Sequence, residues 1–71
     1  ALNGGIDGFS KIRLVIKKSS ILIKKRGKLF LEIGENQTIK VLNLLKSNGF
    51  HMNKIVKDLA NKNRCIVSTK I

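Results

Sequence analysis

The stretch KLFLEIG, from Lys28 to Gly34, constrains the fold of this chain more than any other. Its apolar residues follow one another without clean alternation, which is typical of a strand buried on both faces, as in a parallel sheet. Glu32 stands near the carboxyl end of this strand, where a buried charge is expensive without partners. We therefore expect an α/β fold in which Glu32 serves a purpose other than packing.

Helices are predicted on both sides of this strand in the sequence. Apolar residues at helical spacing predict one helix from about Phe9 to Ile23 and another from Gln37 to Ser47. Asp7 is the expected N-cap of the first helix and Asn36 of the second, because their side chains accept orphan backbone N–H bonds. Gly27 is expected to take the left-handed turn that ends the first helix.

Two more strands are predicted after Gly49, which is expected to end the second helix. They lie near Asn53–Asp58 and near Arg64–Thr69. The strand–helix–strand order predicts a right-handed parallel crossover, and the short loop between the last two strands predicts an antiparallel pair. With 71 residues and no repeat or proline, residues 1–71 are expected to form one small domain at most.

The formal charge of +11 raises the question of a polyanionic partner. Lysine supplies 12 of the 15 cationic residues, whereas base reading and bidentate phosphate contacts favour arginine. The chain has no Tyr or Trp, so a platform for base stacking is poorly supported. A solvated lysine-rich surface is favoured, and a patch that faces a polyanion remains the alternative.

No catalytic or metal-binding set stands out. His51 has no carboxylate partner nearby in the sequence, and Cys65 lies in an apolar strand where an inert buried thiol is expected. One cysteine and one histidine cannot form a four-ligand zinc site, and a lone cysteine fits a reducing, cytoplasmic compartment. No apolar run is long enough to span a membrane.

Short motifs at the junctions between elements carry the strongest signal: ALNGGIDG at 1–8, LEIGENQ at 31–37 and DLANKNR at 58–64. In order and spacing they resemble the C-terminal part of the protein-(glutamine-N5) methyltransferases that modify peptide chain release factors. The matching residues are Ala1, Leu2, Gly4, Gly5, Asp7 and Gly8 in the first motif, Glu32, Ile33, Gly34 and Gln37 in the second, Gly49 and Phe50 after the second helix, and Asp58, Leu59 and Arg64 in the last.

This resemblance implies that residues 1–71 are a single partial domain, the C-terminal portion of a methyltransferase catalytic domain. It implies the C-terminal half of a Rossmann-like sheet, with the last strand antiparallel and placed between the other two. It implies an S-adenosylmethionine-dependent enzyme that methylates a glutamine side-chain nitrogen of a release factor. The glycine-rich loop that binds S-adenosylmethionine and the Asn-Pro-Pro-Tyr motif that holds the glutamine amide are expected upstream of Ala1, so we assign no catalytic, cofactor-binding or metal-binding residue to this chain.

The resemblance implies supporting roles for five residues. Gly4, Gly5 and Asp7 are expected to shape the wall beside the Asn-Pro-Pro-Tyr turn. Glu32 is expected to accept hydrogen bonds from that neighbouring loop or from the substrate, and Gln37 to hold the same rim.

Besides the release factor, two further partners are expected. One is the missing N-terminal half, and the other is a second copy of the chain, bound through the open strand edge at Lys28–Ile33. Two rival functions remain open at this stage: a small basic RNA-associated α/β module, and a non-catalytic remnant.

Overall fold

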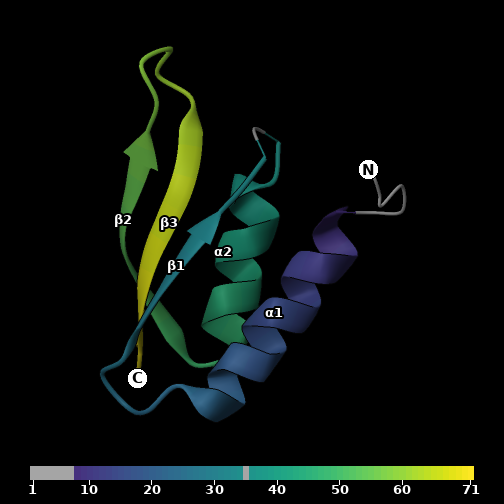
Figure 1. Cartoon of the computed structure of the whole chain (residues 1–71), viewed down its shortest axis with the longest axis vertical. Helices are drawn as coiled ribbons and strands as arrows, with labels where there is room; N and C mark the ends of the chain where they lie inside the picture. The colour runs from purple at the N-terminus through teal and green to yellow at the C-terminus, as the bar shows by residue number, and fades with distance from the viewer. Residues whose placement is uncertain (1–7, 35) are drawn as a thin grey trace.

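The computed structural model of this chain describes residues 8–34 and 36–71. Along the chain the elements are α1 (Gly8–Leu22), β1 (Lys28–Glu32), α2 (Thr38–Ser47), β2 (Phe50–Lys57) and β3 (Asn63–Lys70). The strands form one sheet, α2 packs behind it, and α1 lies beside α2 and β1, away from β2 (Figure 1). No helix among these residues is long and apolar enough to cross a membrane.

The sheet has the order β1-β3-β2, and β3 is antiparallel to both neighbours. The expected position of the last strand and its antiparallel direction are therefore confirmed. Because β1 and β2 are both antiparallel to β3, they run in the same direction, but they are not neighbours. The connection through α2 thus passes over β3, and its right-handedness stays a prediction.

The core lies between α2 and the sheet, with α1 closing one side. In α2, Val41 and Leu45 are buried on the face toward the sheet. The buried apolar side chains are Ile16, Leu31, Ile33, Val41, Leu45, Phe50, Ile66 and Val67. Ser68 is the one fully buried polar residue in the described part of the chain, and its hydroxyl donates a 3.2 Å hydrogen bond to the Leu29 carbonyl.

The prediction that β1 is buried on both faces is wrong. Leu31 is 9% exposed, whereas Phe30 is 66% exposed and Glu32 is also exposed. The strand alternates because α1 and α2 leave one face of the sheet uncovered (Figure 1). An aromatic residue on the uncovered face concealed that alternation in the sequence.

The turn between α1 and β1 also differs from expectation. Arg26 has the positive φ of 74°, and Gly27 does not. A Cβ on Gly27 would lie 2.5 Å from Ile23 Cγ2 and 2.9 Å from the Lys24 carbonyl oxygen. Glycine is therefore required at 27 for space, and Arg26 takes the left-handed position.

The predicted N-cap of α2 and the predicted start of β2 are wrong, whereas the predicted end of α2 is confirmed. The start of α2 is not capped by Asn36: the N-cap is Gln37, which makes no side-chain capping bond. The strand β2 begins at Phe50, earlier than expected, because Phe50 pairs with Lys70. Gly49 ends α2 with a φ of 82°, as predicted.

Candidate functional site

The candidate site is the carboxyl end of β1, here called the rim and consisting of Glu32, Gly34 and Gln37. In the sequence these residues share the LEIGENQ motif, and in the structure they join β1 to α2. Ligand sites of open α/β sheets lie beyond the carboxyl ends of strands. The structure therefore brings Glu32 and Gln37 to the same end of the sheet, as expected.

Gly34 and Gln37 form a closed unit within the rim. The Gly34 N–H donates to Gln37 Oε1 at 2.8 Å, and the Gln37 N–H donates back to the Gly34 carbonyl at 3.1 Å. A Cβ on Gly34 would lie 3.0 Å from Gln37 Oε1. The spacing of Gly and Gln in the motif thus has a local cause: the Gln37 amide fixes the path from β1 into α2.

Two contacts anchor this path to β3. The Ile33 N–H donates to the Arg64 carbonyl at 2.9 Å, and Asn63 Nδ2 donates to Thr38 Oγ1 at 3.0 Å. The second contact joins the beginning of β3 to the first residue of α2. Sequence reasoning missed it, because only the register of β3 brings Asn63 and Thr38 together.

Glu32 is the member of the rim whose side chain makes no hydrogen bond or ion pair with another described residue. It is exposed at the end of β1, and its carboxylate has no hydrogen-bond or ion-pair partner within the described residues. In the sheet register it stands opposite Cys65 on the uncovered face. A carboxylate in this setting is free to accept hydrogen bonds from a neighbouring segment or from a bound molecule.

The third motif, DLANKNR, forms the tip of the β2–β3 hairpin. Asp58 Oδ1 accepts the N–H groups of Ala60 at 2.8 Å and Lys62 at 3.0 Å. Its Oδ2 accepts Arg64 Nε at 2.7 Å. The hydrogen bond from the Lys62 N–H, and then the one from Arg64, hold the pKa of Asp58 below its usual value. Asp58 and Arg64 therefore organise the turn.

The remaining candidates do not extend the rim. His51 is exposed and pairs with Thr69, toward the other end of the sheet from Glu32. Cys65 is half-buried, so the expectation of a buried thiol is wrong. Gly4, Gly5 and Asp7 lie outside the described residues, so their predicted roles stay predictions.

Among the hollows of the described surface, two are lined by residues of α1, α2 and β2. One of about 220 Å³ lies along α1 and is lined by Arg13 and Lys17. The other, of about 350 Å³, lies between α2 and the beginning of β2, against Phe50 and His51. Neither is lined by a residue of the rim.

Comparison with known proteins supplies the family. The chain is 37% identical to the release factor glutamine methyltransferase of Thermodesulfovibrio yellowstonii and 39% identical to that of Clostridium botulinum, over 99% of the chain and 25% of each relative. It is 33% identical to the release factor glutamine methyltransferase of Rhodospirillum rubrum, over 99% of the chain and 22% of the relative.

No family model matches the chain, and no solved structure matches it. The chain spans about a quarter of the length of the curated relatives that it matches. The alignments with these relatives nevertheless cover 99% of the chain. The chain belongs to the release factor glutamine methyltransferase family and corresponds to a C-terminal part of it.

Proposed function

We propose that this chain forms the C-terminal part of an S-adenosylmethionine-dependent methyltransferase that methylates a glutamine side-chain nitrogen of peptide chain release factors in the cytoplasm. The observation that carries the proposal is the similarity to named release factor glutamine methyltransferases over 99% of the chain. The order β1-β3-β2 is compatible with the C-terminal half of a Rossmann-like sheet.

The described rim does not suit S-adenosylmethionine by itself. The Gly34 N–H and the Gln37 side-chain oxygen are already bonded to each other, and Glu32 stands exposed on a sheet edge. No enclosed space is formed by these three residues. The proposal therefore assigns the cofactor pocket and the glutamine-binding motif to a part of the enzyme outside this chain.

Positioning is the contribution that the rim makes in this proposal. Methyl transfer requires nitrogen, methyl carbon and sulfur in line, so the accurate placement of the substrate supplies much of the rate. Glu32 would accept hydrogen bonds from the substrate or from the segment that holds it. Gln37 would act indirectly, by fixing Gly34 and the start of α2, while Gly4, Gly5 and Asp7 would shape the adjoining wall.

A chimeric enzyme tests the proposal. The corresponding C-terminal quarter of the Thermodesulfovibrio relative is replaced by this chain, and transfer of radiolabelled methyl from S-adenosylmethionine to a purified release factor is measured. We expect transfer by the chimera and a loss of turnover of about 10-fold or more in the Glu32→Gln variant, because a neutral amide is a weaker acceptor than a carboxylate. The melting temperature of that variant should be unchanged, since Glu32 is exposed.

The matched control is Asp58→Asn, which makes the same chemical change at the hairpin tip. It should lower the melting temperature and leave turnover unchanged, because Asp58 bonds only to its own turn. A folded chimera without transfer would support the non-catalytic remnant. Full turnover in Glu32→Gln would make Glu32 a residue of no catalytic consequence.

Calorimetry of the chain alone provides an independent check. No saturable binding of S-adenosylmethionine is expected, because the rim offers it no enclosed site. A micromolar S-adenosylmethionine site on the isolated chain would contradict the proposal that the cofactor pocket lies outside this chain.

A further inference from the structure

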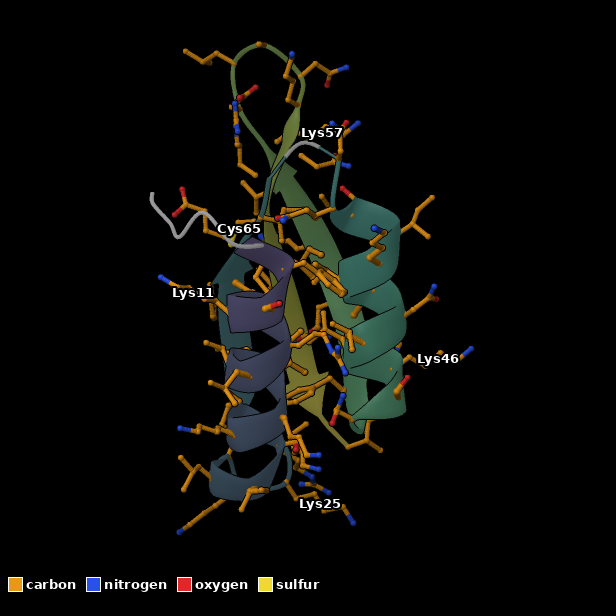
Figure 2. The ribbon with its side chains drawn as sticks, turned by 90° about the vertical axis from the view of Figure 1, so that its right-hand side faces the viewer. Lys11, Lys25, Lys46, Lys57 and Cys65 are labelled. Carbon is orange, nitrogen blue, oxygen red and sulfur yellow. The ribbon has the colours of Figure 1, made fainter. Side chains whose placement is uncertain are left out.

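The end of the molecule opposite the rim concentrates positive charge. We call it the cationic end; its members share the turn between α1 and β1, or the adjoining strand ends, and are Lys24, Lys25, Arg26, Lys28 and Lys70. Other lysines are scattered: Lys11, Lys46 and Lys57 point to different sides of the molecule, whereas Lys25 marks this end (Figure 2).

Backbone hydrogen bonds fix the cationic end. The Arg26 N–H donates to the Lys70 carbonyl, the Lys70 N–H donates to the Gly27 carbonyl, and the Gly27 N–H donates to the Lys24 carbonyl, each at 2.8 Å. These bonds join the turn to the end of β3, so residues far apart in the sequence lie at one end of the sheet. The Lys28 side chain extends over one face of the sheet, beside Thr69, and the Lys70 side chain over the other, beside Phe50.

No acidic side chain balances this charge among the described residues. Glu32 lies at the far end of β1 and Asp58 lies at the hairpin tip, and none of the five cations has a carboxylate at ion-pair distance. Lys28 Nζ donates instead to Thr69 Oγ1 at 2.9 Å, and Lys70 Nζ lies 5.8 Å from the Phe50 ring centroid. Both helices end here, but a helix carboxyl end offers only about half a negative charge.

Arg26 gives a second, independent reason to assign a function to this end. Its left-handed backbone, with φ of 74°, costs a non-glycine residue roughly 1–2 kcal/mol. Glycine would fill the same position without this cost, yet the chain carries a guanidinium there. A charged side chain at a strained position points to a role for the charge.

We propose that the cationic end binds the phosphodiester backbone of a nucleic acid. Lysine-rich contacts of this kind neutralise phosphates without reading base edges, so we expect little sequence preference. Ile21 and Leu22 are exposed nearby, which is also compatible with an anionic lipid surface. The lack of an interfacial Trp or Tyr and the excess of charge over apolar area favour the nucleic acid.

The test measures fluorescence anisotropy of labelled 20-nucleotide single strands of mixed sequence, as RNA and as DNA, titrated with the chain at 50 to 200 mM salt. With about five phosphate contacts and a slope near −0.7 per contact, affinity should fall about 100-fold over this range. The triple variant Lys24→Gln, Lys25→Gln, Arg26→Gly should bind about 10-fold more weakly or worse at 50 mM and lose less than about 10-fold over the range.

A matched triple variant, Lys11→Gln, Lys18→Gln, Lys57→Gln, removes the same charge from other exposed positions, and circular dichroism verifies that both variants fold. Wild-type binding with a near-normal salt slope in this control supports the proposal. Tighter binding of RNA or of DNA shows which nucleic acid the cationic end prefers. Equal binding of the two shows that it contacts only the phosphodiester backbone. The proposal is overturned if the control loses as much affinity, if binding is insensitive to salt, or if the chain binds phosphatidylserine vesicles but neither oligonucleotide.

Discussion

Asp58 shows how much structure one side chain determines in this small fold. Its carboxylate accepts two backbone N–H groups and the Arg64 guanidinium, and the Asp58 backbone bonds to Lys62 and Asn61 at 2.9 Å each. Asn61 completes the turn with a φ of 65°. An aspartate that begins a turn in this way supplies the hydrogen-bond acceptor for backbone N–H groups within the turn.

The depressed pKa of Asp58 makes the hairpin sensitive to acid. The carboxylate stabilises the fold above the ordinary Asp pKa near 4, and this contribution is lost as the pH falls through the lower folded-state pKa. Asp58→Asn should therefore lower the melting temperature by a few degrees at pH 7. Once the pH lies below the folded-state pKa, the two proteins should converge, because the wild-type carboxyl is then neutral as well. Thermal melts across this range provide the measurement, and an undiminished difference at pH 2 would assign the loss to something other than charge.

At the scale of elements, the turn between α1 and β1 separates two roles that glycine plays in proteins. Gly27→Ala should destabilise the chain by about 1–3 kcal/mol, because the new Cβ would lie 2.5 Å from Ile23 Cγ2. Arg26→Gly should stabilise it by about 1 kcal/mol or less, since relief of the left-handed strain is offset by a more flexible unfolded state. Denaturant unfolding of both variants decides the matter. The opposite order of effects would mean that Gly27, and not Arg26, bears the left-handed conformation.

The helices and the sheet differ in how far the amino-acid sequence predicts them. Helical periodicity is a local property, so the apolar spacing predicted α1 and α2 to within about one residue at most ends. The exposure of Phe30 depends on which faces of the sheet are covered, and no local pattern encodes that. The site role of the rim stays a prediction, and the expected burial of β1 around Glu32 is wrong, because Glu32 is exposed on the uncovered face.

Pairs that depend on strand register were out of reach. The hydrogen bond between Asn63 and Thr38 joins residues 25 apart in the sequence, and no local sequence pattern predicts this pair. The need for glycine at position 27 has a nearer cause, since a Cβ there would meet Ile23 Cγ2 and the Lys24 carbonyl oxygen. That contact depends on how the chain leaves α1, which the residue pattern does not encode.

For the whole molecule, the outer edge of β1 is the main unsatisfied feature. The bonds from Ile33 to Arg64 and from Lys70 to Gly27 show that odd-numbered residues of β1 face β3. By the alternation of antiparallel ladders, the N–H and C=O groups of Lys28, Phe30 and Glu32 point outward. No strand pairs with them within the described residues. We predict that the isolated chain self-associates along Lys28–Ile33.

Sedimentation over a range of concentration and salt tests this prediction, with association favoured at higher salt because the net charge of +11 opposes it. Phe30→Pro deletes an outward N–H that β3 does not use, so it should shift the chain toward monomer. Phe30→Ala removes the ring but keeps that N–H, and serves as the control. A compact wild-type monomer at all concentrations would show that the edge needs no strand.

The order β1-β3-β2 places the last strand of the chain in the middle of its sheet. The strands β1 and β2 do not pair with each other, so both ladders of the sheet form only when β3 is present. During synthesis, which proceeds at about 5–20 residues per second, β1 and β2 both emerge before the strand that pairs with them. A ribosome that stalls before Asn63 therefore holds a nascent chain in which β1 and β2 lack β3 as a partner until translation resumes.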